Sequence, residues 1–280
     1  MTKDILKKHE FAFTQSDFDT LCRLIMDYAG IKMHQGKEDM IYGRISRRVR
    51  KLGLRSFSEY VDLLEANPSG EEMGRFVNAV TTNMTSFFRE NHHFEYMKQT
   101  LLPELMEHHK MDHRIRIWSA GCSSGEEPYS IAMTMAETMP AGWDAKILAT
   151  DLDTDMVAHA ANGIYESKRV NGLAKGKVRR WFSRNRKYPD MVKIKSPLQE
   201  MITFRQLNLL HDWPMNGPLD AIFCRNVIIY FDTETKRKLM ARYADLLAPH
   251  GRLFLGHSES LLNISDQFKL CGKSIYAKGQ

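Results

Sequence analysis

The stretch that decides the fold is Arg114-Ile-Arg-Ile-Trp-Ser-Ala-Gly-Cys-Ser-Ser-Gly-Glu-Glu-Pro-Tyr129. Its first seven residues, 114–120, are typical of a strand that ends in small side chains. A helix over 127–139 follows, with Pro128 near its first turn, where proline is favoured. Gly121 and Gly125 lie between the two elements and would let a ligand approach the backbone closely. We therefore predict a strand, a ligand-binding loop and a helix, as in the first unit of an α/β sheet.

The sequence on either side of this stretch extends the same pattern. After it we predict strands at 146–151, 202–207, 219–224 and 252–256, helices at 153–162 and 234–247, and two short strands or a hairpin at 268–277. Before it, residues 14–75 are expected to be helical, and further helices are expected at 71–82 and 91–109. Strands that alternate with helices indicate a mostly parallel sheet covered on both faces.

Composition and charge limit the possible functions. The 280 residues suggest two domains, and 43% hydrophobic with 26% charged residues is ordinary for a globular protein. The net charge of +6 is local, because residues 164–200 contain 11 basic and 3 acidic residues, a net +8 that leaves −2 for the rest. Such a basic segment favours an acidic partner, which could be nucleic acid, an anionic lipid surface or an acidic protein.

Targeting and cysteine signals point to the cytoplasm. No apolar run reaches the ~18 residues needed to cross a bilayer, and the first ten residues lack the apolar core of a signal peptide. The four cysteines are scattered without a CxxC pair, which fits a reducing compartment. We expect a cytoplasmic monomer with no metal site and no membrane insertion.

Polar residues follow four successive predicted strands. Glu127, Asp151, Asn208 and Asn226 all stand at or just after carboxyl ends, where open α/β sheets bind ligands. Two carboxylates in the first loop argue against a pyrophosphate and for a cationic or amino-bearing ligand. Glu126 and Glu127 could instead stabilise a helix N-terminus, and Asp151 could be a helix cap. The convergence of four strand ends predicts a nucleoside-type pocket.

Five motifs occur in order and resemble the CheR family of chemotaxis receptor methyltransferases, which transfer a methyl group from S-adenosylmethionine to glutamates of chemoreceptors. The motifs are Thr82-Asn-Met-Thr-Ser-Phe-Phe-Arg-Glu90, Trp118-Ser-Ala-Gly-Cys-Ser-Ser-Gly-Glu-Glu-Pro-Tyr-Ser130, Ala149-Thr-Asp-Leu-Asp153, Phe223-Cys-Arg-Asn-Val-Ile-Ile-Tyr-Phe231 and Leu255-Gly-His-Ser-Glu259. The resemblance implies a small all-helical N-terminal domain (1–75) and a linker (76–112) with a cofactor-covering segment. A Rossmann-like class I methyltransferase domain (113–280) would follow, with an antiparallel β-subdomain inserted at about 164–200.

The resemblance also implies a set of site residues. Arg89 and Tyr230 would be catalytic, Arg89 as a holder of the substrate carboxylate and Tyr230 near the departing methyl group. The cofactor and its product S-adenosylhomocysteine would be bound by residues with the following roles: Asn83, Thr85 and Arg89 as cover, Glu127 at the methionine amino group, Asp151 at the ribose, Asn208 and Leu209 at the adenine, and Asn226 and Val227 near the sulfonium. Simpler alternatives are a salt bridge between Arg89 and Glu90 and a core position for Tyr230.

Two surfaces could meet a receptor. The first is a run of basic residues without an acidic neighbour, Arg44, Arg47, Arg48, Lys51 and Arg55, which is either a solvated face or a docking face. The second is the insert, where 191–195 alternates like an exposed edge strand. One branch of the family captures a receptor's C-terminal pentapeptide there beside a glycine-rich turn. Residues 181–195 contain no glycine, and lysines and Pro189 discourage added strands, so we expect no tight pentapeptide capture.

Three functions are compatible with these observations. Protein-glutamate methylation of chemoreceptors leads, in an enzyme recruited to membrane-associated receptor arrays. An RNA methyltransferase is the alternative, because Trp181, Phe182 and Tyr188 lie among the basic residues of the insert and could stack on bases. No RNA-binding signature accompanies them, so no nucleic-acid partner is expected. A regulator that binds the cofactor without turnover is disfavoured because all five motifs are complete.

Overall fold

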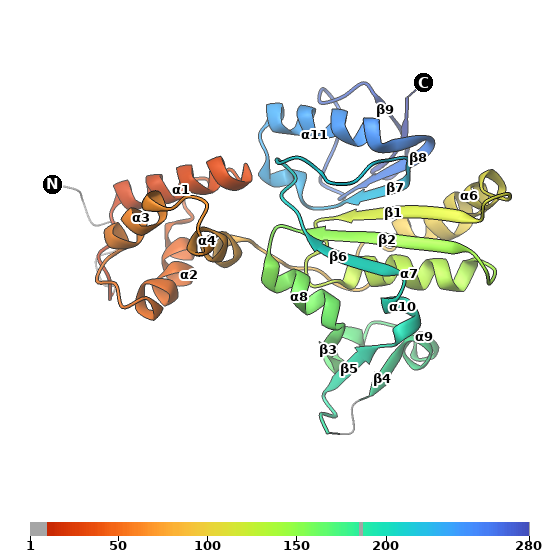
Figure 1. Ribbon diagram of the computed structural model, residues 1–280, viewed down its shortest axis with the longest axis horizontal. Coiled ribbons are helices and arrows are strands. Elements are labelled where there is room, and N and C mark those ends of the chain that lie inside the picture. Colours follow the sequence, from red (N-terminus) through yellow and green to blue (C-terminus); the bar gives the residue numbers. More distant parts are fainter. Residues whose placement is uncertain (1–9, 185–186, 280) are drawn as a thin grey trace. The chain divides into compact units, whose positions relative to one another are not determined.

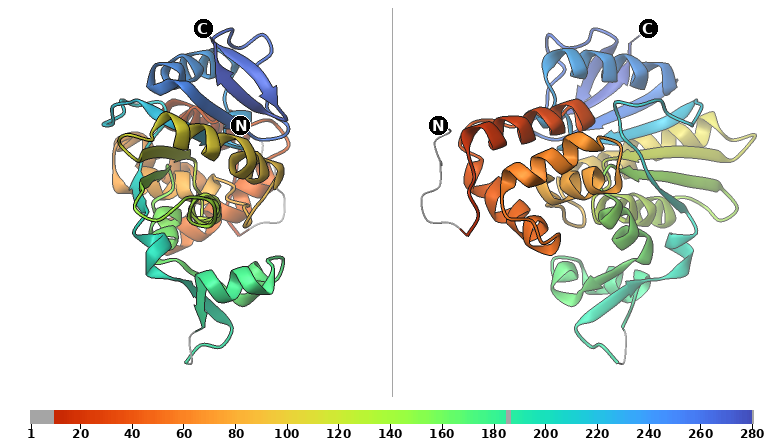
Figure 2. Two further views of the ribbon diagram at one scale, coloured as in Figure 1. Left: turned by 90° about the vertical axis from the view of Figure 1, so that its right-hand side faces the viewer. Right: turned by 60° about the vertical axis from the view of Figure 1, so that its left-hand side comes forward.

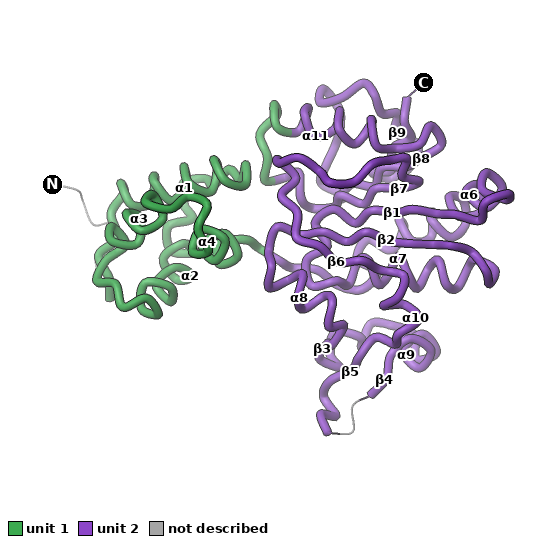
Figure 3. Tube along the Cα trace, in the orientation of Figure 1, with its two compact units in different colours: residues 1–82, 230–235 green, residues 83–229, 236–280 purple. Residues whose placement is uncertain are grey.

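The computed structural model describes residues 10–184 and 187–279. The chain forms two compact units (Figure 3). Unit 1 comprises Met1–Thr82 with Tyr230–Thr235, and unit 2 comprises Asn83–Ile229 with Lys236–Gln280. The division between the two units falls after Thr82, and the domain bounds 1–75 and 76–112 stay a prediction.

Unit 1 contains the expected helices. They are α1 (Gln15–Ala29), α2 (Glu38–Lys51), α3 (Phe57–Ala66) and α4 (Glu71–Val80). Helix α1 begins with a capping box, in which the Thr14 hydroxyl accepts the N–H of Asp17 and the Asp17 carboxylate accepts the N–H of Thr14. Gly30 ends it in the left-handed conformation. The ring centroids of Phe13 and Phe57, both fully buried, are 4.4 Å apart. The apolar residues that recur at helical spacing in the sequence therefore form the core of unit 1.

Unit 2 is built on a seven-stranded sheet with the order β6-β2-β1-β7-β8-β10-β9 (Figure 1). The strands are β1 (Arg114–Ala120), β2 (Asp144–Asp151), β6 (Ile202–Gln206), β7 (Leu219–Cys224), β8 (Leu247–Leu255), β9 (Phe268–Gly272) and β10 (Ile275–Lys278). The first five are parallel, and β9 and β10 form an antiparallel hairpin beside β8. The predicted, mostly parallel sheet is confirmed.

Among the described residues, two helices of unit 2 precede β1, and three lie between strands of the sheet. They are α5 (His92–Tyr96), α6 (Leu102–His108), α7 (Glu126–Thr138), α8 (Thr154–Asn162) and α11 (Thr233–Leu246). The helix expected over 91–109 is interrupted by one π-helical turn, Met97–Leu101, between α5 and α6. Helix α7 is buried along most of its length against the sheet. In the described part of the chain, no helix is long and apolar enough to cross a membrane.

The basic insert forms the expected antiparallel subdomain. Strands β3 (Ile164–Glu166), β4 (Phe182–Arg184) and β5 (Met191–Ile194) form a sheet in the order β3-β5-β4, with α9 (Lys175–Trp181) and α10 (Ser196–Gln199) beside it. Both views of Figure 2 show it projecting from the main sheet of unit 2. Our interpretation of 191–195 as an edge strand is wrong, because β5 pairs with both β3 and β4 and is central. Asn185 and Arg186 lie outside the described residues.

A groove of about 750 Å³ crosses this subdomain. Its lining combines apolar side chains with three cations: Val170, Leu173, Val178, Phe182 and Val192, and Lys175, Arg179 and Arg184. The positive charge noted in the sequence of the insert therefore lies next to an apolar depression.

Candidate functional site

The strand order places the predicted site residues along one edge of the sheet. Strands β6, β2, β1 and β7 are consecutive neighbours and parallel, so their carboxyl ends meet at the same edge. The chain proceeds from β1 to β2 and β6 on one side and then crosses to β7 on the other. The crevice between β1 and β7 is therefore the topological switch point, where open α/β sheets bind ligands.

The loop after β1 is held tightly against its neighbours. Gly121 has φ +96°, and a Cβ added there would lie 2.4 Å from a methyl carbon of Val227. Gly125 also has φ +96°, and a Cβ there would lie 2.8 Å from Ala160. Protein side chains occupy the space where a Cβ would stand, and the close approach of a ligand to this backbone stays a prediction. Gly121 and Gly125 allow the loop's turns and its close packing.

Asp151 ends β2 and faces this loop. Its Oδ2 accepts the N–H of Ser123 (2.7 Å) and its Oδ1 accepts the N–H of Asp153 (3.0 Å). Burial raises the pKa of Asp151 to about 6, although these backbone hydrogen bonds act in the opposite direction. The helix-cap alternative fails, since Asp153 caps α8 by accepting the N–H groups of Asp155 and Met156. The Asp151 carboxylate is therefore not the N-cap of α8.

Glu127 is buried and has two partners. Its Oε1 accepts the hydroxyl of Ser119 (2.7 Å), and its Oε2 is 2.9 Å from Nη1 of Arg225. Burial raises the pKa of Glu127, and the Arg225 charge opposes that shift. Arg225 is only 6% exposed, and it lies 3.4 Å from Glu90 as well. Sequence reasoning missed Arg225, although an arginine in the quoted motif at the end of a buried strand was an available signal.

The segment after Thr82 lies over the loop that follows β1. The amide nitrogen of Asn83 donates to Asp153 (2.7 Å), and the Ser123 hydroxyl donates to the carbonyl oxygen of Asn83 (3.0 Å). The carbonyl of Thr85 is 3.4 Å from Nη1 of Arg169. Asn83 therefore contacts Ser123 and Asp153, the two residues whose backbone N–H groups donate to Asp151.

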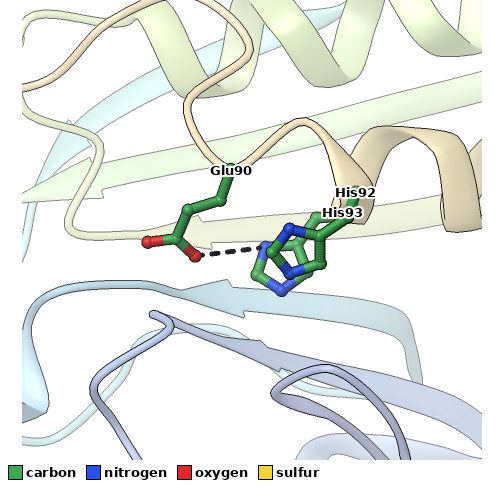
Figure 4. A group of neighbouring side chains, drawn as sticks. All are labelled: Glu90, His92 and His93. Atoms are coloured by element: carbon green, nitrogen blue, oxygen red, sulfur yellow. Dashed lines mark ion pairs between the residues drawn. The ribbon is translucent and has the colours of Figure 1, made fainter.

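The guanidinium of Arg89 turns back on its own segment and donates to the Met84 carbonyl (2.8 Å). Glu90 pairs with Arg225, with His257 (Oε1 to Nδ1, 2.8 Å) and with buried His93 (Oε2 to Nδ1, 3.7 Å). Figure 4 shows the Glu90 carboxylate directed toward His93, with His92 beside it. Burial disfavours the charged form of Glu90, but the hydrogen bonds from His257 and the charge of Arg225 outweigh it and lower the pKa of Glu90 to about 2. Burial lowers the pKa of His93 to about 3, so its imidazole is neutral.

The loop after β7 is fixed by a second residue that sequence reasoning missed. Asn226 has φ 59°, and its N–H donates to Oε2 of Glu259 (2.8 Å). Glu259 also accepts the N–H groups of Gly256 (2.6 Å) and Ile229 (3.2 Å). Burial raises the pKa of Glu259, and the hydrogen bonds from backbone N–H groups oppose this. Glu259 stands in a quoted motif, yet only the fold shows that its carboxylate holds the turn containing Asn226 and Val227.

The remaining predicted residues fall into two groups. Asn208 follows β6, where its Oδ1 accepts the N–H of Leu210 (3.0 Å), and Leu209 beside it is buried. Both therefore lie at the expected edge of the sheet. Tyr230 belongs to the segment 230–235 of unit 1, where its carbonyl accepts the N–H of Lys32 (2.9 Å). Its role near the methyl group stays a prediction.

The five basic residues proposed for receptor docking do not form one free face. Arg44 donates to the carbonyls of Val80 (2.8 Å) and Thr81 (2.7 Å) at the end of α4. Arg48 pairs with Glu72, which also accepts the hydroxyl of Tyr60. The exposed members are Arg47, Lys51 and Arg55.

The class of protein is that of the Rossmann-like methyltransferases with a helical N-terminal domain. The family model described as "CheR methyltransferase, SAM binding domain" matches residues 83–277, and "CheR methyltransferase, all-alpha domain" matches residues 16–81. The chain therefore belongs to the CheR methyltransferase family, as the motifs indicated.

Curated relatives are similar over nearly the whole chain. The chemotaxis protein methyltransferase of Salmonella typhimurium is 42% identical over 272 residues, which covers 95% of this chain and 91% of that protein. The Escherichia coli protein of the same name is 41% identical, with 95% and 92% covered. Chemotaxis protein methyltransferase 2 of Pseudomonas aeruginosa is 40% identical over 277 residues, with 98% and 96% covered.

Proposed function

We propose that this protein transfers the methyl group of S-adenosylmethionine to glutamate side chains of chemoreceptors, which yields glutamate methyl esters and S-adenosylhomocysteine. Family membership and the names of the relatives support the receptor substrate. The observation that carries the cofactor site is the Asp151 carboxylate, which ends β2 next to the switch point and is not used as a helix cap.

The residues at the strand ends would each bind a different part of the cofactor. Asp151 would accept hydrogen bonds from the ribose hydroxyls, and Asn208 and Leu209 would contact the adenine. Glu127 would attract the methionine amino group, in a site where Arg225 already balances part of the carboxylate charge. Asn226 and Val227 would lie near the sulfonium, held by Glu259. Asn83, Thr85 and Arg89 would cover the bound cofactor.

The reaction needs positioning more than acid–base chemistry. The sulfonium of the cofactor supplies an electrophilic methyl group. A glutamate with a reference pKa of about 4.3 is ionised at neutral pH and needs no base to activate it. Catalysis then depends on holding the carboxylate in line with the methyl group. The forked donors of Arg89 suit that task, and Tyr230 would orient the carboxylate or line the methyl path.

The decisive experiment identifies the bond that is formed. The protein is incubated with methyl-labelled S-adenosylmethionine and the cytoplasmic domain of a chemoreceptor. We expect label on the receptor that mild base releases as methanol, because carboxyl esters hydrolyse readily. Label that survives base, or label transferred to added RNA instead, would contradict the proposal and favour the alternative of an RNA methyltransferase.

A second arm of this assay tests pentapeptide capture, using the same receptor without its last five residues. We expect equal methylation of both forms. The insert has no glycine in 181–195, and its two edge strands, β3 and β4, each have three residues in the described part of the chain, which offer few backbone groups for an added strand. The groove beside β4 would instead take acidic and apolar receptor side chains. Loss of methylation on truncation, with micromolar binding of the free pentapeptide, would overturn this expectation.

Receptor docking through α2 gives a further prediction. Reversing Arg47 and Lys51 to glutamate should raise the apparent KM for receptor about three- to tenfold at low salt, because exposed charges steer encounter and are screened by ions. Cofactor affinity should not change. Arg44 and Arg48 are unsuitable for this test, since they hold α4 and Glu72.

The matched control reverses two exposed lysines of unit 2, Lys98 and Lys269, and changes the net charge equally. A KM that is indifferent to the α2 reversals and to salt, or one that rises equally in the control, would show that the α2 face is merely solvated.

We also infer a cytoplasmic monomer that receptor contacts recruit to membrane-associated arrays and that has no nucleic-acid partner. Light scattering and the RNA arm above test these inferences.

A further inference from the structure

Two histidines and an aspartate converge at the edge of the main sheet opposite to the cofactor loops. Asp220 is the second residue of β7 and is buried. His109 follows α6, and His250 lies in β8, where the register with β7 shifts between Leu219 and Ala221. The Nε2 atoms of His109 and His250 are 2.8 Å and 3.0 Å from the same atom, Oδ1 of Asp220. The other oxygen of Asp220 accepts the N–H of Arg116 (2.7 Å).

His109 lies between two carboxylates. Its Nδ1 is 3.1 Å from Oδ1 of Asp112, while its Nε2 faces Asp220. An imidazole can bind a metal ion through the lone pair of one ring nitrogen while the other nitrogen donates its N–H to a carboxylate. Asp112 stands at the nitrogen that would donate, and Asp220 at the nitrogen that would bind the metal. His250 presents its own Nε2 to the same point.

The arrangement has the donor set and the outer contacts of a transition-metal site. Two imidazole nitrogens and one carboxylate oxygen are common zinc ligands, and in a tetrahedral site they lie about 3.3 Å apart. The Nε2 atoms of the two histidines are 2.8 Å and 3.0 Å from the Asp220 oxygen, and all three atoms lie within 4.8 Å of one another, so both imidazoles already stand close to that spacing from the carboxylate oxygen. Asp112 would accept the Nδ1–H of His109, which is the usual outer partner of a metal-bound histidine.

We propose that His109, Asp220 and His250 bind a divalent transition-metal ion, Zn²⁺, which ties the end of α6 to the starts of β7 and β8. The site is separate from methyl transfer, which takes place at the opposite edge of the sheet. The absence of a CxxC pair gave no hint of it, because the ligands are histidine and aspartate and lie far apart in sequence. The bound ion would stabilise unit 2 against unfolding.

Zinc titration of the untagged, metal-stripped protein tests this directly. We expect one saturable calorimetric site and a rise in Tm of roughly 5 °C at a hundredfold excess of zinc over Kd. Co²⁺ should give visible bands of a nitrogen and oxygen site without thiolate charge transfer. His250→Gln should abolish binding, as should His109→Gln. Asp112→Asn should weaken it about 10- to 100-fold, because it loosens the orientation of His109.

His92→Gln is the matched control, since His92 belongs to the other cluster of potential ligands, with Glu90 and His93. It should bind zinc like the unmodified protein. Circular dichroism checks that each variant is folded. His250 is partly exposed, so His250→Gln leaves the contact between Asp220 and His109 in place. The proposal is overturned if the unmodified protein shows no saturable zinc binding, or if His250→Gln binds zinc with unchanged affinity.

Discussion

Asp151→Ala should bind S-adenosylmethionine about tenfold to a hundredfold more weakly than the unmodified protein. Hydrogen bonds to a charged acceptor contribute ~1.5–3 kcal/mol, and Asp151 would supply such an acceptor to the ribose. Calorimetric titration with the cofactor and with S-adenosylhomocysteine measures the effect. Thermal unfolding of Asp151→Ala controls for damage to the fold, since the cap of α8 is Asp153 and stays in place. Equal affinities of Asp151→Ala and the unmodified protein would remove the ribose assignment.

The raised pKa of Asp151 adds a pH signature to this prediction. Ribose hydroxyls donate hydrogen bonds, so they favour the ionised carboxylate. Since the pKa of Asp151 is about 6 without ligand, cofactor affinity should be constant above pH 7 and fall about tenfold at one unit below this pKa. The contribution of Asp151 to folding stability has the opposite sign. A carboxyl whose pKa is raised by folding stabilises the fold at low pH and loses that contribution as the pH rises through 6.

Asp151→Asn separates this residue from other titrating groups near the site, such as Glu127 and Glu259. Asparagine keeps the shape of the side chain but cannot ionise. Its cofactor affinity should therefore be lower at pH 7 and should lose the decline near pH 6. If the decline persists unchanged in Asp151→Asn, another carboxyl is responsible for it.

Arg89→Ala should reduce kcat by roughly a hundredfold with a smaller effect on stability. A small error in the position of the receptor carboxylate costs this much in an in-line transfer. In the structure the guanidinium rests on the Met84 carbonyl, a contact between neighbours that it can exchange for a substrate carboxylate at little cost. Single-turnover methylation measures the chemical step, and thermal unfolding measures stability.

Arg89→Lys should restore only part of the rate, because lysine has a single donor group in place of the planar fork. Arg75→Ala, at an exposed arginine of α4 that pairs with Glu71, controls for the loss of one positive charge. A fully active Arg89→Ala enzyme with normal cofactor affinity would exclude Arg89 from catalysis.

Local sequence signals determined most of the architecture. The bounds of β1 and β7 follow from short apolar runs that end in small or polar residues, and α1 from apolar spacing between Thr14 and Gly30. These signals work because strand and helix periodicity, caps and turns depend on residues only a few positions apart. The motifs at the strand ends, including Asp151 and Asn226, could be found in the same way, since the role proposed for them follows from their place after a strand.

The tertiary structure decided which residues are paired with which. Arg225 meets Glu127 and Glu90, and Glu259 meets the N–H of Asn226, across long separations in sequence. Whether Arg44 is a docking residue or a partner of α4 depends on how two helices pack. The spacing of residues along the chain does not predict such contacts. The partner of a buried charge depends on how distant segments pack and on the free-energy cost of leaving that charge unpaired.

Strand order is the second feature that the sequence left open. The alternation of Met191–Ile194 predicts a strand, but it does not distinguish an edge from a centre, since both can bury one face. The position of β5 between β3 and β4 follows from pairing with segments on both sides of it. The same holds for His109, Asp220 and His250, which only the neighbouring positions of α6, β7 and β8 bring to one point. Sequence thus determined what each segment becomes, and the packing of distant segments determined which side chains share a site.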